Sequence, residues 1–198
     1  MTTIIAVQTD TCAVVASDSR ITSFDDKNYI YQMNTLASST PKIATNGKYI
    51  LGAAGDMRAI NILHNAFVPP APPVRAKGKT LDKFITSKFV PALKDCFELH
   101  GYSSSPKDSS DQQDSDILVV VNGYVYVIEN DYGWMSDNRG VYAVGTGAAY
   151  ALGALDALDA WSSQNANDLK RKVTQAMRIT AKWDVMTGPP FTVLVQER

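Results

Sequence analysis

The chain has 198 residues, of which 45% are hydrophobic, and its 19 basic and 20 acidic residues give a net charge of −1. This length favours one domain, over residues 1–198, and the balanced charge without a basic block argues against nucleic acid as a partner. No run approaches the roughly 20 apolar residues of a membrane span, and the N-terminus lacks the positive region of a signal peptide, so we expect a cytoplasmic protein with no membrane partner.

The first part of the chain predicts two hairpins, each made of two short apolar runs. Their strands are expected at residues 2–9 with 12–17, and at 42–45 with 49–55. The second hairpin turns at Asn46-Gly47, a strong two-residue turn signal. A turn centred on Asp10-Thr11 pairs residues whose numbers sum to about 21. This register places Asp18 beside Thr3, next to the start of the chain.

Helical and strand-like segments then alternate. Asp56 is a natural N-cap for a helix that ends at the proline-rich segment 68–74, and a second helix is expected at about 80–99. The polar segment 101–116 predicts a mobile surface loop. The remaining predictions are a hairpin over 116–130 turning at Asn122-Gly123, a strand at 140–145, helices at 147–161 and 166–183, and a closing strand at 191–196.

This order of elements predicts the fold class. Strands are followed by two helices, further strands, two more helices and a last strand. Several strands are apolar on both faces, which indicates sheets covered by helices on one side and by another sheet on the other. We therefore expect an α+β fold, a four-layer α/β/β/α sandwich.

Cysteine and histidine are too few and too scattered for a metal centre. Cys12 and Cys96 lie far apart, and neither has a second cysteine at metal-ligand spacing. His64 and His100 form no pair. We expect free thiols in a reducing compartment, no metal and no cofactor.

Short motifs in a fixed order span nearly the whole chain. They are "TTIIAV" with "VVASDSRIT", "PKIA", "YILGAAG", "VGTGAAYALGALDA" and "WDVMTG". Together they resemble the proteasome β-subunit family, including its bacterial relative HslV, within the N-terminal nucleophile hydrolases. The sequence departs from the family pattern in a longer segment between Asp18 and Lys42, in threonine at two serine positions, and in Pro189 after Gly188.

The resemblance implies a threonine-type endopeptidase. Thr2, once Met1 is removed, is implied as nucleophile and, through its α-amine, as base, because a threonine hydroxyl is a poor nucleophile without one. Lys42 is implied as the cation near that hydroxyl, held by Asp18. The N–H of Gly55 is implied as the donor that binds the oxyanion.

Further roles follow from the same resemblance. Thr146, Asp184 and Thr187 are implied to orient the amine and a nucleophilic water. Ala53 is implied at the base of the pocket for the substrate residue before the cleaved bond, with Ile21 as a wall. A small base leaves room for large side chains, so we expect a preference for bulky apolar residues over acidic ones.

The implied partners are further copies of the chain, in a closed homo-oligomeric ring, and two stacked rings are expected. Polypeptides are the implied substrates, and an unfolding ATPase is a possible further partner under the same resemblance. Two alternatives stay open at this point: a non-catalytic ring or shell subunit of the same fold, and a small-molecule amidase of the wider superfamily. A dinucleotide site at Gly145-Thr146-Gly147 is disfavoured, because Tyr150 stands where a third glycine is needed.

Overall fold

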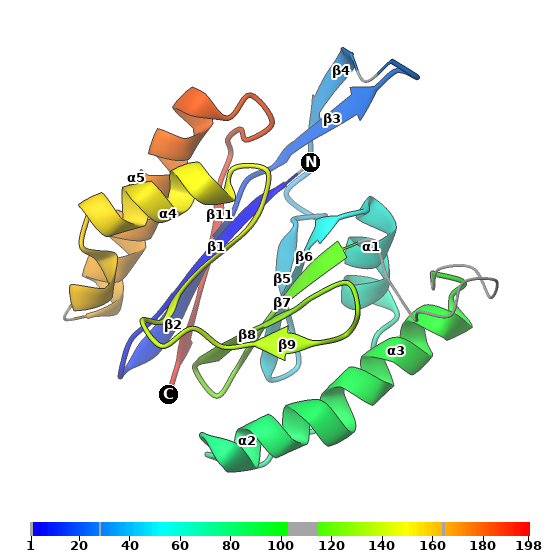
Figure 1. The fold of residues 1–198 in the computed structure, drawn as a ribbon, viewed down its shortest axis with the longest axis vertical. Coiled ribbons are helices and arrows are strands. Elements are labelled where there is room, and N and C mark those ends of the chain that lie inside the picture. Colours follow the sequence, from blue (N-terminus) through cyan, green and yellow to red (C-terminus); the bar gives the residue numbers. More distant parts are fainter. Residues whose placement is uncertain (1, 28, 103–114, 164) are drawn as a thin grey trace.

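The computed structural model describes residues 2–27, 29–102, 115–163 and 165–198. Within these residues the strands form a four-stranded sheet, a five-stranded sheet and a separate two-stranded pair (Figure 1). The first sheet has the order β10-β1-β2-β11, with antiparallel neighbours. Its strands are β1 (Thr3–Gln8), β2 (Cys12–Ser17), β10 (Val141–Gly145) and β11 (Thr192–Glu197). Ile4 lies opposite Ser17, so the predicted register of the first hairpin is confirmed.

The second sheet has the order β5-β6-β7-β8-β9. Its strands are β5 (Ile43–Asn46), β6 (Tyr49–Gly55), β7 (Ser115–Val121), β8 (Tyr124–Ile128) and β9 (Trp134–Met135). Both predicted Asn-Gly turns are confirmed. Gly47, Asn122 and Gly123 have φ of 58°, 52° and 74°, the left-handed conformations that such tight turns need. The polar loop predicted over 101–116 lies, for residues 103–114, outside the described residues.

The predicted helices form near the expected positions. They are α1 (Met57–Asn65), α2 (Lys79–Phe84), a π-helical turn (Ile85–Phe89), α3 (Val90–Leu99), α4 (Ala148–Ala157), a short 3₁₀ turn (Ala160–Ser162) and α5 (Ala166–Trp183). The Asp56 side chain accepts from the Arg58 N–H, as expected of an N-cap. The predicted 80–99 helix contains the π-helical turn just before Pro91. There the Val90 N–H bonds to the Ile85 carbonyl, one residue further back than in an α-helix.

Alternating burial along the strands gives the layers of the fold. In β6, Tyr49, Leu51 and Ala53 face the helices, whereas Ile50 and Ala54 lie between the two sheets. Helices α1, α2 and α3 cover the second sheet, and α4 and α5 cover the first (Figure 1). The predicted α+β four-layer sandwich is therefore confirmed.

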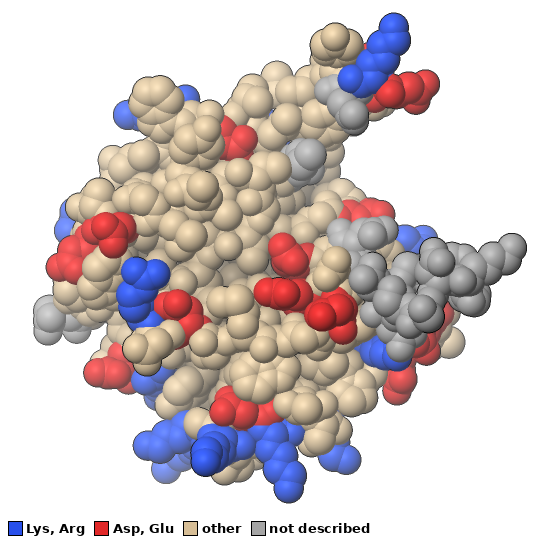
Figure 2. Space-filling model, in the orientation of Figure 1, with Lys and Arg blue, Asp and Glu red and all other residues tan. Residues whose placement is uncertain are grey.

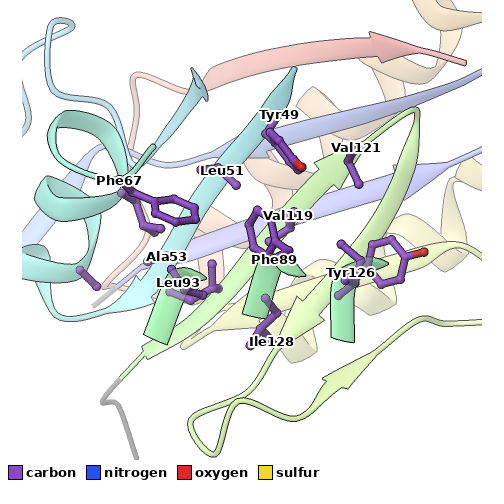
Figure 3. Packing of buried hydrophobic residues seen from close by; sticks show 14 of the residues in the cluster. Tyr49, Leu51, Ala53, Phe67, Phe89, Leu93, Val119, Val121, Tyr126 and Ile128 are labelled. Carbon is purple, nitrogen blue, oxygen red and sulfur yellow. The ribbon is translucent and has the colours of Figure 1, made fainter. Parts of the chain in front are cut away.

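Aromatic rings fill the outer core between the second sheet and its helices. Phe89 packs against Tyr49 with ring centroids 5.1 Å apart and against Phe67 at 5.6 Å (Figure 3). Phe89 comes from the π-helical turn, so this turn directs a large side chain onto the sheet. Aromatic pairs of this kind add about 0.5–1.5 kcal/mol beyond the area that they bury.

One hairpin was not expected from the sequence. Strands β3 (Arg20–Phe24) and β4 (Ile30–Thr35) pair with each other and project from the body of the molecule (Figure 1). Every residue of β4 is exposed, and charged side chains gather at the tip of the hairpin (Figure 2). This hairpin lies within the segment between Asp18 and Lys42. Among the described residues, no helix is both long and apolar enough to cross a membrane.

His64 makes the stability of the fold depend on pH. Its ring is partly buried, and the Nε2–H donates to the Leu51 carbonyl at 3.1 Å. Burial lowers the pKa of His64 below its ordinary value of 6.5, and the bond to Leu51 only partly opposes this. The unfolded chain therefore takes up a proton at higher pH than the folded chain. The contribution of neutral His64 to stability is complete above pH 6.5 and is lost as the pH falls through the lowered pKa.

We expect the melting temperature to fall between about pH 7 and pH 5 more steeply in the wild-type protein than in His64→Gln. Glutamine does not titrate, and its amide can still donate to the Leu51 carbonyl. Thermal unfolding followed by circular dichroism across this pH range measures both slopes. Equal slopes would show that His64 does not set this pH dependence.

Candidate active site

Asp18 follows β2 directly, and its buried carboxylate accepts four hydrogen bonds. The Thr3 N–H donates to Oδ1 at 3.0 Å, and the Lys42 ammonium donates to the same oxygen at 2.8 Å. The N–H groups of Arg20 and Gly188 donate to Oδ2 at 2.9 Å and 3.2 Å. Four separate segments of the chain therefore meet at one carboxylate.

Lys42 lies just before β5, and its side chain is fully buried. Its ammonium donates to Asp18 and, at 2.6 Å, to the Arg20 carbonyl. Burial lowers the pKa of Lys42 below its ordinary value of 10.5, because water no longer stabilises the charge, while the neighbouring Asp18 partly opposes this change. A buried cation with a lowered pKa can take part in proton transfer more readily than a solvated lysine.

A second polar cluster forms where α5 ends. Asp184 is the residue after the last turn of that helix, and its side chain is almost fully buried. Thr187 and Thr146 donate their hydroxyl protons to Oδ2 of Asp184 at 2.6 Å and 3.0 Å. The Met186 N–H donates to the other oxygen. The loop from Asp184 to Thr187 therefore folds around its own carboxylate.

Both clusters lie at the beginning of β1. The Thr3 main chain bonds to Asp18, and the Thr3 hydroxyl lies 2.6 Å from the Thr187 hydroxyl. The Thr146 N–H donates to the Thr2 carbonyl at 3.0 Å. Thr2 itself is 3% exposed. The structure thus brings Thr2, Asp18 and Lys42 together with the cluster formed by Thr146, Asp184 and Thr187.

Two glycines close to Thr2, Gly55 and Gly145, occupy positions where a side chain would be strained or would clash. Gly55 ends β6 with φ of 147°, a conformation that side chains rarely adopt. Gly145 has φ of 90°, and a Cβ placed on it would overlap the Thr2 carbonyl and lie 3.4 Å from Ala54. The end of β6 therefore lies close to Thr2, where the resemblance places the oxyanion donor.

The two expected substrate-binding residues lie on different sheets. Ala53 is fully buried in the outer core beneath α1 and α3, and Ile21 is partly exposed on β3. Their role in substrate binding stays a prediction. Among the described residues, no group of three histidine, cysteine, aspartate or glutamate side chains could hold a metal ion.

Three contributions were missed by the sequence reasoning. Arg20 supplies a main-chain donor and a main-chain acceptor, and its guanidinium donates to the Val185 carbonyl at 2.6 Å. Gly188 contributes a main-chain donor, and its neighbour Pro189 leaves that contact in place. The third is the Thr3 hydroxyl. Each of these residues lies inside a quoted motif, but their contacts depend on segments far apart in the sequence.

We expect Asp18→Asn to lower the free energy of unfolding by about 3–5 kcal/mol, the usual cost of breaking a buried ion pair. The amide keeps one acceptor oxygen and turns an NH₂ group toward hydrogen-bond donors. Lys42→Met should cost less, because Asp18 keeps its main-chain donors from Thr3, Arg20 and Gly188. Urea unfolding at one fixed protein concentration measures both variants. Equal losses would contradict this assignment of Asp18 as the shared acceptor.

Comparisons with known proteins give matches in structure. No family model matches the sequence, and no curated protein matches it. Thiobacillus denitrificans BPH is similar with a TM-score of 0.73 and 19% identity, over 98% of this chain and 97% of that one. The same protein in complex with epoxomicin gives 0.72 and 18%, over 98% of both chains. HslV from Trypanosoma brucei gives 0.64 and 17%, over 99% of both chains. The chain therefore has the fold of the proteasome-type and HslV proteins that its motifs resemble.

Proposed function

We propose that this chain is a threonine-type endopeptidase in which Thr2, freed by removal of Met1, is the nucleophile. One observation carries the proposal: two buried carboxylates, each with its own set of donors, converge on the first residues of β1. Burying carboxylates and a lysine is costly, and such groups are often found where chemistry needs them. The fold shared with BPH and HslV supports the same reading.

The α-amine of Thr2 would act as base. Its unperturbed pKa of about 7.7–8.0 allows it to accept the hydroxyl proton near neutral pH. The Thr2 oxygen then bonds to the carbonyl carbon of the substrate, and the C–N bond of the peptide breaks. The proton passes to the leaving amine. Water hydrolyses the resulting ester and restores the free hydroxyl.

Lys42 would stabilise the negative charge that develops on the Thr2 oxygen, and Asp18 holds the lysine in place. Removal of water around Lys42 strengthens this electrostatic effect. The Gly55 N–H would donate to the oxyanion, a contact typically worth about 3–4 kcal/mol of barrier. Thr146, Asp184 and Thr187 would orient the amine and the attacking water.

Removal of Met1 would be the activating step. While Met1 is present, the Thr2 nitrogen is an amide and cannot act as a base. We expect Thr2→Ala and Met1-retaining protein to cleave peptides at least about 10³-fold more slowly than trimmed protein. Thr11→Ala is the matched control, because this threonine lies in the exposed β1–β2 turn.

Fluorogenic peptides measure the rates, and intact mass after incubation with epoxomicin, the compound bound by BPH, gives a second readout. Trimmed protein should gain a covalent adduct that Thr2→Ala lacks. If Met1-retaining and trimmed proteins cleave peptides equally fast, Thr2 is not the nucleophile. If neither form cleaves peptides or gains an adduct, the chain is a non-catalytic ring or shell subunit of the same fold.

We also propose that the chain forms a closed homo-oligomeric ring and that two such rings stack. The rings would confine polypeptide substrates, in the cytoplasm, and could work with an unfolding ATPase. A head-to-tail interface that closes on itself produces such a ring. BPH and HslV match this chain over nearly their whole length, which supports one domain as the repeating unit. We expect native mass spectrometry at micromolar concentration to give an even multiple of the chain mass. A monomer would contradict the ring.

A further inference from the structure

We propose that Thr3 is a positioning residue, whose hydroxyl holds the reactive Thr2 in register with the Asp184 cluster. The inference rests on the proposed function and adds a role for the second of the two threonines. Thr3 is fully buried, so its side chain acts through neighbouring residues and does not touch the substrate.

The main chain of Thr3 is bonded to the Asp18 side of the site. Its N–H donates to the Asp18 carboxylate at 3.0 Å, and its carbonyl accepts from the Asp18 N–H at 3.2 Å. Any residue except proline could make both bonds. The Asp18 side therefore does not explain why residue 3 is a threonine.

The hydroxyl of Thr3 is bonded to the other side of the site. Thr187 has one hydroxyl proton, which it donates in the 2.6 Å hydrogen bond to Oδ2 of Asp184. The Thr187 oxygen must then accept at the 2.6 Å contact, so Thr3 is the donor there. The Thr3 oxygen in turn accepts from the Gly147 N–H at 3.1 Å. The direction of every proton in this chain of bonds is thus fixed.

These contacts place Thr3 between the two clusters. Its main chain holds Asp18, and its side chain holds Thr187 and the start of α4. Thr2 is the adjacent residue, and its carbonyl is bonded to Thr146. The peptide that joins residues 2 and 3 is held at both ends, which limits where the Thr2 hydroxyl can lie. Misplacement of a reacting group by about 1 Å can cost 10²-fold in rate.

Substitution at position 3 tests the inference in trimmed protein. Thr3→Val has nearly the same shape but neither donates nor accepts, whereas Thr3→Ser keeps the hydroxyl. We expect Thr3→Val to lower kcat about 10- to 100-fold with KM changed less than about twofold. Thr3→Ser should recover kcat to within about threefold. Thr180→Val is the control, since this buried hydroxyl bonds to Ala176 of its own helix.

Hydrogen exchange of the Gly147 amide gives a readout that needs no activity. Exchange should be faster in Thr3→Val than in the wild-type protein or Thr3→Ser, because the valine deprives this N–H of its acceptor. An active Thr3→Val with unchanged kcat would overturn the inference, as would a loss that serine does not restore or an equal loss in Thr180→Val. If trimmed wild-type protein is inactive and unreactive toward epoxomicin, the proposed function fails. Unchanged Gly147 exchange shows separately that the Thr3 contact is absent.

Discussion

The carboxylate of Asp18 is the contact on which the site depends. It collects donors from the start of β1, from β3, from Lys42 before β5 and from the loop before β11. A carboxylate with both oxygens shared in this way fixes four segments relative to one another. Without it, the buried ammonium of Lys42 would lose its hydrogen-bonded counter-ion, and burial of an unpaired charge is very costly. The position of Lys42 and the position of the N-terminal strand therefore both depend on the Asp18 carboxylate.

Close packing of the two sheets brings these segments within reach. Gly52 shows how close the sheets lie, because a Cβ placed on it would stand 3.1 Å from the Ile4 side chain of the facing sheet. Small and branched apolar residues fill the space between the sheets. The same packing removes water from Lys42 and lowers its pKa. The apolar layer between the two sheets therefore stabilises the fold and, by excluding water, also sets the electrostatics of the site.

Turn and helix-cap residues in the sequence predicted most of the fold, because turns and caps depend on residues only a few positions apart. The turn at Asp10-Thr11 gave the pairing of Thr3 with Asp18, and Asp56 gave the start of α1. The β3–β4 hairpin escaped prediction because its connection carries no Asn-Gly signal and β4 buries no face. The π-helical turn before Pro91 was also not predicted. Pro91 has no backbone N–H to donate, which changes the helix hydrogen bonds around it but leaves the spacing of the apolar residues unchanged.

The sequence by itself determined the order of the elements, the tight turns and the residue types available for chemistry, because these depend on neighbours a few positions apart. The tertiary structure decided which of those residues meet. The bonds from Thr3 to Gly147 and Thr187 span 144 and 184 positions, and no local pattern reports them. The same holds for Lys42, whose lowered pKa arises from desolvation between packed layers. Desolvation and hydrogen bonds between distant segments exist only once the sheets have closed on each other.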